Sequence, residues 1–280
     1  MELALKELLT EKALAVRRKI IKMIYKAGSG HPGGSLSLVE ILVTFYFGDV
    51  LRYREDDPFW SDRDRLILSK GHGIPSLYSV WSEIGWIPEY MLWTLRKLNS
   101  PLQGHPDRRK LPLIEISSGS LGQGLSVGIG MALAGKIDKK DYRVYVIMGD
   151  GEMEEGQVWE AAMFAGFHKL NNLTALVDYN KFQLDGPIGE ILNIEPLSDK
   201  WKSFGWEVFE VDGHSFDELK DVFDRIKENS FEKPQCVIAH TVKGKGVSFM
   251  ENNNEFHGRA PTKEEALKAL RELGEIYPEI

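Results

Sequence analysis

The sequence predicts an α/β fold in which helices cover both faces of a mainly parallel sheet. Short apolar runs of strand length alternate with helical patterns along the second half of the chain. Polar residues follow several of these runs directly, which is where open α/β sheets bind ligands. The 280 residues are 42% hydrophobic and 28% charged, so we exclude a disordered chain and expect a sizeable core.

The charge balance and the cysteine content exclude several classes of protein. The net charge of −7 makes the chain a poor general binder of nucleic acid. A single cysteine, Cys236, excludes an internal disulfide framework, and we expect it to be a small buried residue of a strand. The charged N-terminal residues leave no room for a signal peptide, and no apolar stretch is long enough to span a membrane. We therefore expect a soluble, cytoplasmic protein that does not bind membranes.

The first 50 residues are expected to form two helices. Apolar residues spaced by three and four positions predict one helix over residues 3–27, and Gly28 ends it. After a glycine-rich loop, Ser35 or Ser37 is expected to cap a second helix that stops at Gly48.

The middle of the chain carries the first predicted strand and a long loop. The strand covers residues 64–69, and a helix follows from about Pro75. A loop with proline and glycine covers residues 99–112, and residues 113–116 are expected to form a short strand. Small residues predict a close-packed helix over Gly124–Gly135.

The second half of the chain shows the clearest alternation. Strands are predicted at residues 143–148, 173–179, 207–211 and 235–241, and helices at 155–169, 200–204 and 215–228. The last 20 residues are expected to form an exposed, charged helix. No linker or composition shift divides the chain, so we expect one domain over residues 1–280.

Two polar residues at strand ends indicate a metal–diphosphate site. Asp150 directly follows one strand and Asn180 follows the next, so both are expected at the same edge of the sheet. Their oxygens, with a backbone carbonyl such as that of Phe182, suit Mg²⁺ or Ca²⁺. Gly149 and Gly151 would let a diphosphate approach the backbone. A tight turn would explain the glycines alone, but the pairing with Asn180 favours the metal site.

Histidines form the second signal. Five of the seven lie in loops flanked by glycine or proline, namely His31, His72, His105, His214 and His257. Their number predicts a polar pocket that handles protons on a hydroxylated substrate, and their spacing does not fit a zinc site. We interpret His214 as a turn residue, and His168 and His240 as structural.

Three further segments permit more than one interpretation. The glutamates Glu152 and Glu154 are expected to interact with a helix dipole. Residues 118–130 form an imperfect dinucleotide fingerprint, and for Gly119–Gly122 we favour close approach to a flat ligand. The run at residues 243–246 (Lys-Gly-Lys-Gly) is either a solvated basic turn or lies near a phosphate, and it lacks the Walker A spacing.

Together these motifs resemble those of transketolases, over essentially the whole chain up to about residue 262. The motifs are Ser29-Gly30-His31-Pro32-Gly33, Leu68-Ser69-Lys70-Gly71-His72, Gly104-His105-Pro106, Gly119-Ser120-Leu121-Gly122-Gln123-Gly124, Gly149-Asp150-Gly151 with Glu155-Gly156, Asp178-Tyr179-Asn180-Lys181, and His257-Gly258. The resemblance implies the diphosphate-binding domain fold of enzymes that use thiamine diphosphate.

The resemblance also implies roles for individual residues. The metal ligands would be Asp150, Asn180 and the carbonyl of Phe182. The cofactor contacts would be His72, Gly119, Leu121, Gly151, Asn180, Leu184 and His257. The histidines that contact substrate hydroxyls would be His31, His105 and His257. Glu155 would link to the cofactor-activating glutamate across a subunit interface.

The chain departs from the family pattern in two respects. Tyr179 replaces the usual Asn or Asp before Asn180, which keeps the ligand position. We also expect this chain to lack the pyrimidine-binding and C-terminal domains, with the activating glutamate. We therefore expect the N-terminal subunit of a split transketolase, which acts on sugar phosphates in a heterotetramer with two copies of a separate C-terminal subunit. Alternatives are deoxyxylulose-phosphate synthase or another carboligase, a non-catalytic cofactor-binding subunit, and a dehydrogenase built on Gly119–Gly130.

Overall fold

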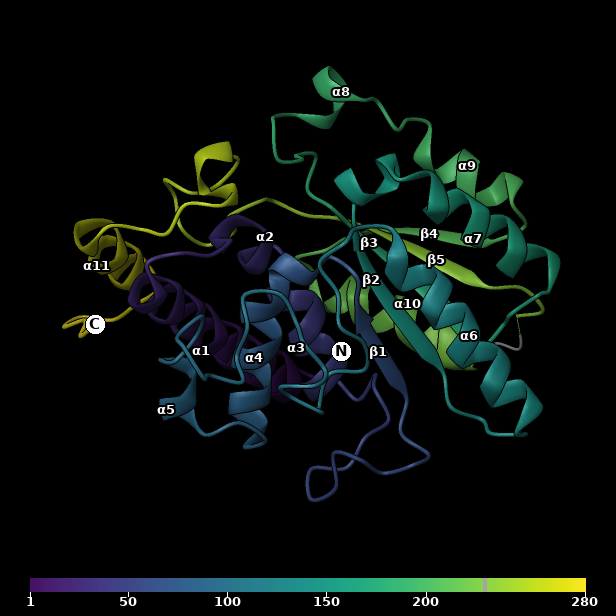
Figure 1. Cartoon of the computed structure of the whole chain (residues 1–280), viewed down its shortest axis with the longest axis horizontal. Helices are drawn as coiled ribbons and strands as arrows, with labels where there is room; N and C mark the ends of the chain where they lie inside the picture. The colour runs from purple at the N-terminus through teal and green to yellow at the C-terminus, as the bar shows by residue number, and fades with distance from the viewer. Residues whose placement is uncertain (229–230) are drawn as a thin grey trace.

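The computed structural model describes residues 1–228 and 231–280 and confirms the α/β fold (Figure 1). The described residues form a five-stranded sheet whose strands are all parallel, in the order β1-β2-β3-β5-β4. The strands are β1 (Arg65–Leu68), β2 (Val144–Gly149), β3 (Leu173–Tyr179), β4 (Glu207–Asp212) and β5 (Gln235–His240). Cys236 is buried in β5, as expected.

Two apolar clusters cover the two faces of the sheet. Along β2, Tyr145 and Ile147 belong to one cluster, whereas Val144, Val146 and Met148 belong to the other, because successive side chains point to opposite faces. The first cluster includes α1 (Leu3–Ala27), α3 (Val39–Phe47), α4 (Ile74–Ile84) and α10 (Phe216–Glu228). The second includes α6 (Gln123–Ile137), α7 (Gly156–Phe167) and α9 (Leu197–Ser203). Figure 1 shows α6 and α7 across the sheet from α1, α3 and α4.

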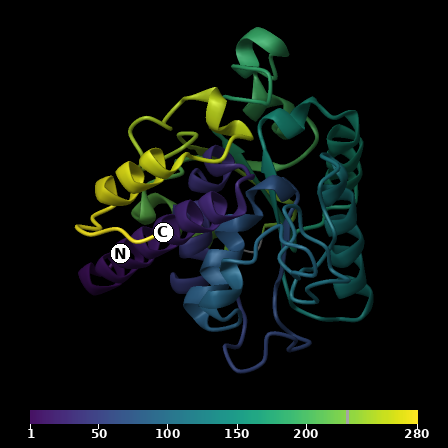
Figure 2. The ribbon, with the colours of Figure 1, turned by 60° about the vertical axis from the view of Figure 1, so that its left-hand side comes forward.

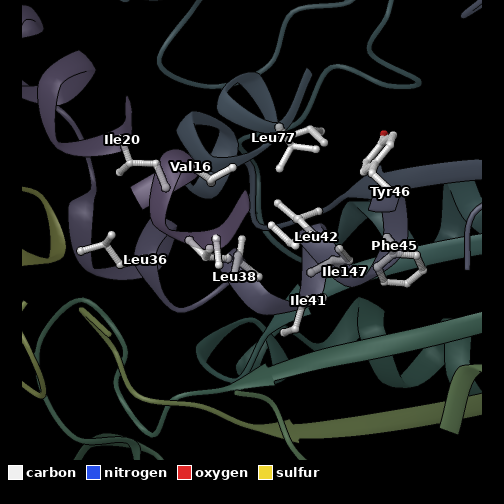
Figure 3. Packing of buried hydrophobic residues seen from close by; sticks show 14 of the residues in the cluster. Val16, Ile20, Leu36, Leu38, Ile41, Leu42, Phe45, Tyr46, Leu77 and Ile147 are labelled. Atoms are coloured by element: carbon white, nitrogen blue, oxygen red, sulfur yellow. The ribbon is translucent and has the colours of Figure 1, made fainter. Parts of the chain in front are cut away.

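The predicted first helix is confirmed as α1. Its C-cap is Gly28, whose φ of 66° is left-handed and whose N–H donates to the carbonyls of Ile24 and Tyr25. The buried face of α1 packs on α3 and α4. In Figure 3, Leu42 and Phe45 of α3 lie beside Ile147 of β2, so α3 sits between the sheet and α1.

The expected serine cap of the second helix is wrong. The helix begins earlier, at Pro32, and is divided into α2 (Pro32–Leu36) and α3, with no side-chain cap on either. Proline is pre-organised for the first helical position, so it starts the helix without a serine. The Ser35 hydroxyl instead donates to the His31 carbonyl (2.7 Å), and the Ser37 hydroxyl donates to the Asp178 carboxylate (2.6 Å).

Two other predicted elements differ from the structure. Residues 113–116 form turns rather than a strand, because the Ile114 N–H is used locally by the Leu111 carbonyl (3.1 Å) and Glu115 pairs with Arg63 (2.7 Å). The C-terminal helix, α11 (Lys263–Glu272), is not fully exposed. Figure 2 shows α11 beside α1. The small apolar face of α11 is buried, so only the opposite face carries exposed charge.

Short elements complete the described part of the chain. They are α5 (Glu89–Leu92), α8 (Ile188–Ile191) and the 3₁₀ turns Gly71–Gly73, Gly151–Glu154 and Asn254–His257. No helix in residues 1–228 or 231–280 combines the length and the apolar character needed to cross a membrane.

Candidate active site

A pocket of about 400 Å³ opens at the carboxyl ends of the strands. The sheet register explains its position, because Gly149 lies opposite Asp178 and Tyr179 lies opposite His240. The pocket brings together all the site residues predicted from the sequence, which are His31, His72, His105, Gly119, Leu121, Asp150, Gly151, Glu155, Asn180, Phe182, Leu184 and His257.

The oxygen donors predicted for a metal lie at the ends of β2 and β3. Asp150 is buried, and its carboxylate accepts hydrogen bonds from the backbone N–H groups of Gly151 (2.9 Å) and Lys181. The side-chain oxygen of Asn180 accepts from the N–H of Phe182 (3.2 Å). These bonds join the two strand ends, so that the carboxylate and the amide line one wall of the pocket.

Electrostatics at Asp150 favour a bound cation. Burial and the nearby charge of Asp178 raise the pKa of Asp150 to about 7. A positive ion beside the carboxylate would stabilise its charged form. Within the described residues no group of three or more His, Cys, Asp or Glu side chains is placed so that it could hold a metal ion by itself. The Asp150 carboxylate and the Asn180 amide offer hard oxygen donors, and a cation held by so few protein groups would need water or phosphate oxygens to complete its shell.

A buried lysine–aspartate pair supports the floor of the pocket. The fully buried Asp178 accepts hydrogen bonds from Lys70 Nζ (2.5 Å), Ser37 Oγ (2.6 Å) and Thr241 Oγ1. Burial alone would raise the pKa of Asp178, but the Lys70 charge and these bonds hold it below its usual value. The pair ties α2 and the residues after β1 and β5 to β3.

The helix-dipole interpretation of Glu152 describes only part of its environment, although the residue does lie in the first turn of the 3₁₀ segment Gly151–Glu154. This glutamate is buried and accepts hydrogen bonds from the N–H groups of Gly149 (3.1 Å) and Gly122 (2.8 Å) and from the Ser69 hydroxyl. It therefore fixes the start of α6 against the ends of β1 and β2. Proximity in the sequence to a helical turn suggests the dipole, but two of the three partners, Ser69 and Gly122, come from segments far away along the chain.

Three histidines surround the imidazole ring of His31. The centroid of the His31 ring lies 5.3 Å from that of His72, 5.6 Å from His105 and 5.7 Å from His257. Burial and the neighbouring His105 lower the pKa of His31 to about 4, and burial and the Lys243 charge lower the pKa of His257 to about 3. These imidazoles are therefore neutral near pH 7, and each has one nitrogen to donate and one to accept.

The remaining histidines lie outside the pocket. His168 is exposed at the end of α7, and His240 contacts Glu210 (2.9 Å). His214 lies in a turn, as predicted, and it also connects two other segments of the chain. Its Nδ1 contacts the Glu40 carboxylate (2.9 Å), and its Nε2 accepts from the N–H of Val242 (2.8 Å).

A buried ionic network holds the basic loop at residues 242–246. Arg17 pairs with Glu40 (2.7 Å) and its Nε donates to the carbonyl of Lys245 (3.0 Å), while His214 links Glu40 to the loop backbone. Burial alone would raise the pKa of Glu40, but the Arg17 charge and the bond from His214 lower it to about 2. The network therefore fixes the loop that carries Lys243.

Two lysines in the pocket were not assigned to the site from the sequence. Lys243 is buried, and its Nζ contacts His257 Nδ1 (2.8 Å) and the side-chain oxygen of Asn254 (2.6 Å). This contact indicates that the basic run at residues 243–246 belongs to the pocket and is not a solvated turn. Lys70 and Lys243 both come within two residues of predicted strand ends, so the rule that selected Asp150 would have found them.

The glycine run serves two purposes. A Cβ at Gly124 would lie 2.3 Å from the Ser69 hydroxyl, and one at Gly128 would lie 2.5 Å from Val146, which confirms the close-packed helix. Gly119, in contrast, is exposed and lines the pocket with a φ of 150°. Approach of a flat ligand to Gly119 remains a prediction.

Comparisons with known proteins agree with this geometry. A family model described as "Transketolase, thiamine diphosphate binding domain" matches residues 10–278. One of the relatives is a subunit of the apulose-4-phosphate transketolase of Phocaeicola vulgatus. It is 42% identical over 261 residues, which cover 92% of this chain and 91% of that protein. The 6-deoxy-6-sulfo-D-fructose transketolase subunit SqwG of Clostridium sp. is 44% identical over 265 residues, covering 95% and 96%.

Longer relatives match over only part of their length. Human transketolase is 40% identical over 266 residues, which cover 95% of this chain but 42% of the human protein. The crystal structure of transketolase from Campylobacter jejuni has a TM-score of 0.89 at 32% identity, and the match covers 98% of this chain and 43% of that one.

The fold and the pocket define a thiamine-diphosphate-binding domain. The chain belongs to the transketolase family. It corresponds to the N-terminal subunit of transketolases that are made from separate chains.

Proposed function

We propose that this chain is the cofactor-binding subunit of a two-chain transketolase, which transfers a two-carbon glycolaldehyde unit from a ketose phosphate to an aldose phosphate. One observation carries the proposal: a single pocket holds oxygen donors at two strand ends, exposed glycine backbone and a cluster of neutral histidines. Thiamine-diphosphate chemistry on sugars needs a diphosphate cradle and groups that handle hydroxyl protons, and this pocket offers both.

The metal would be held by Asp150, Asn180 and the Phe182 carbonyl. These are hard oxygen donors, so Mg²⁺ or Ca²⁺ fits, and diphosphate oxygens would complete the shell. The raised pKa of Asp150, about 7, supports this assignment because no residue in the described part of the chain forms an ion pair with this buried carboxylate. We therefore expect metal and cofactor to bind together.

The cofactor would lie along the pocket wall from β2 to the start of α6. The proposed contacts are His72, Gly119, Leu121, Gly151, Asn180, Leu184 and His257. When bound, thiamine diphosphate supplies an electron sink for the two-carbon unit. Lys243 supports this wall, because its ammonium group donates to His257 Nδ1 and so leaves the proton of the neutral ring on Nε2.

His31, His105 and His257 are proposed to contact substrate hydroxyls and move their protons. Each is neutral near pH 7, so each can accept a proton from a hydroxyl and return it. His31 Nδ1 is buried and has no hydrogen-bond partner among the described residues. A substrate hydroxyl would satisfy this nitrogen, since a buried polar atom without a partner is costly.

The partner chain would complete the site. Glu155 is exposed and lines the pocket, a position that suits contact with the cofactor-activating glutamate of a separate chain with a pyrimidine-binding domain. We infer an assembly of two copies of each chain. The partner's identity, this stoichiometry and a cytoplasmic location are proposals that rest on the sequence.

A transketolase assay tests the proposal. Xylulose 5-phosphate and ribose 5-phosphate would be supplied with thiamine diphosphate and Mg²⁺, first with this chain alone and then with a candidate C-terminal subunit. Activity only in the mixture is the expected result. Activity of the chain alone would contradict the shared site, and an inactive complex would favour another carboligase or a non-catalytic role.

A further inference from the structure

The 242–246 loop is held through its main chain by two side chains from other parts of the fold. The N–H of Val242 donates to His214 Nε2 (2.8 Å), and Arg17 Nε donates to the carbonyl of Lys245 (3.0 Å). His214 comes from the turn before α10 and Arg17 from α1, and neither lines the pocket. The backbone on both sides of the pocket lysine of this loop is therefore fixed from outside the site.

One tautomer of His214 fits its two contacts. A backbone N–H can only donate, so the Nε2 atom of His214 accepts and the proton of the ring lies on Nδ1. The Nδ1–H group then donates to the Glu40 carboxylate (2.9 Å), which also accepts from Arg17 (2.7 Å). The side chains of these three residues are at most 12% exposed. The ring therefore links a buried ion pair to the loop in one orientation only.

The ammonium group of Lys243 has little freedom to adjust. Its Nζ atom contacts the side-chain oxygen of Asn254 (2.6 Å), His257 Nδ1 (2.8 Å) and the Gln183 carbonyl (3.3 Å). An ammonium group has three N–H donors, so these acceptors use all of them. The aliphatic stem passes against Gly33, where a Cβ would lie 3.0 Å from Lys243 Cγ. A shift of the loop backbone would therefore pull the ammonium group away from these acceptors.

We propose that His214 is a positioning residue of the active site, which acts through the loop backbone to hold Lys243 on His257. This inference rests on the proposed function, because it takes His257 to contact the cofactor and the substrate. With the ammonium group on its Nδ1 atom, His257 keeps its own proton on Nε2. A displacement of about 1 Å in a group that positions reactants can cost about 100-fold in rate, so this distant anchor affects turnover.

Three histidine variants test this role in the two-chain complex. His214→Phe keeps a ring of similar size but can neither accept nor donate a hydrogen bond. His214→Gln keeps an amide oxygen that can accept from the N–H of Val242, so it is the conservative variant that should restore the function. His240→Phe is the matched control, because His240 also contacts a glutamate (Glu210, 2.9 Å) but lies outside the pocket.

Steady-state kinetics separate positioning from a general loss of stability. We expect kcat/KM for the ketose donor to fall about tenfold or more in His214→Phe and to stay within about threefold of the wild type in His214→Gln. Lys243→Met removes the positioned group, so adding His214→Phe to it should cost nothing further. Losses that multiply in the double variant, or no loss in His214→Phe, would overturn the inference. A wild-type complex inactive with every ketose donor would instead overturn the proposed function.

Nuclear magnetic resonance of this chain alone tests the same contacts without an activity measurement. Long-range ¹H–¹⁵N spectra of histidine-labelled protein distinguish ring nitrogens that carry a proton from those that accept a hydrogen bond. In the wild type we expect the proton of His214 on Nδ1 and that of His257 on Nε2. A proton on Nε2 of His214 would overturn the inference, and this measurement needs no variant to fold.

The variants give a second spectroscopic readout. We expect His214→Phe to move the His257 Nδ1 signal towards its position in Lys243→Met, and His240→Phe to leave that signal unchanged. A His257 signal that keeps its wild-type position in a folded His214→Phe chain would overturn the inference, even if the two-chain complex is inactive.

Discussion

Three acidic side chains at the ends of β2 and β3 differ because of their neighbours. Asp178 has Lys70 beside it and stays charged, whereas Asp150 is buried without a cation and has a pKa raised to about 7. Burial also raises the pKa of Glu152, whose partners are neutral donors. Asp150 and Glu152 thus both lack an ion-pair partner among the described residues, and we assign Asp150 to the metal because it lies at the strand end beside Asn180.

The histidine cluster predicts a specific dependence of stability on pH. The pKa of His31 is about 4 in the folded chain and about 6.5 when unfolded. The unfolded chain therefore binds more protons between these values, so the cluster makes stability rise as pH increases from about 4 to 6.5. His31→Gln should flatten this rise, as measured by urea unfolding at several pH values without cofactor.

Comparison with matched variants isolates that effect. Asp150 has a raised pKa, so it makes stability fall as pH increases, which is opposite to the effect of His31. Asp150 is present in both proteins, so its contribution cancels when their pH dependences of stability are subtracted. His168→Gln is the control, because His168 is exposed and lies outside the pocket. An identical pH dependence in the wild type and in His31→Gln would contradict the prediction.

At the scale of elements, we expect the buried network of Arg17, Glu40 and His214 behind the 242–246 loop to stabilise the fold. Glu40 joins α3 to α1 through Arg17 and to the turn before α10 through His214. Glu40→Gln leaves the arginine charge buried without its partner, so we expect the free energy of unfolding to fall by about 3 kcal/mol. Urea unfolding measures the change, with the exposed Glu7→Gln as control. A loss no larger than that of Glu7→Gln would show that the network contributes little.

Helix α6 offers a second test at this scale through two of its glycines. A Cβ at Gly128 would lie 2.5 Å from Val146 of β2, whereas Gly130 has open space around it. Gly128→Ala should therefore destabilise the chain by about 1–3 kcal/mol through overpacking. Gly130→Ala should stabilise it by about 0.5–1 kcal/mol through helix propensity. Thermal unfolding of both variants checks the opposite signs, and equal effects would refute the packing argument.

At the scale of the whole molecule, metal and cofactor should act together. At about 100 times the dissociation constant, a ligand adds about 2.7 kcal/mol of stability, or about 5–10 °C in Tm for a chain of this size. We expect thiamine diphosphate to give this shift only with Mg²⁺ present, and EDTA to abolish it. A shift that is independent of the metal would contradict the assignment of the donors.

Asp150→Asn should remove most of this shift, because the amide lacks the negative charge that balances the cation. Asp141→Asn is the matched control, since Asp141 is exposed and pairs with Arg52 at the surface. Differential scanning fluorimetry with and without both ligands measures the two variants. An undiminished shift in Asp150→Asn would remove this residue from the metal site.

The sequence predicted the sheet and the strand-end residues because both are local patterns. Alternation gave the strands, and the rule that parallel strands end at one edge placed Asp150 beside Asn180. The missed features depend on distant contacts. Ser37 is one of two serines expected to cap a helix, but its hydroxyl reaches Asp178. Glu152 is expected to interact with a helix dipole, but it also binds Ser69 and Gly122.

The same reasoning explains the errors in the elements. Apolar residues at 113–116 looked like a strand, but nothing in the sequence shows that Glu115 is held by Arg63. The charged end of the chain looked fully exposed because its small apolar face becomes visible only when α11 meets α1. Periodicity in the sequence predicts which face of a helix or strand is apolar. Which other element packs on that face is decided only in the assembled fold.

The strand order also constrains when the pocket can form during synthesis. β5 is the last strand made, yet it lies between β3 and β4. Until it emerges from the ribosome, β3 and β4 each present an unpaired edge, which is a risk for aggregation. Lys243 and His257 emerge later still, so the nascent chain cannot assemble its cofactor pocket until nearly all of these residues have been made. Cofactor capture should therefore follow the synthesis of nearly all of the residues described here, up to at least His257.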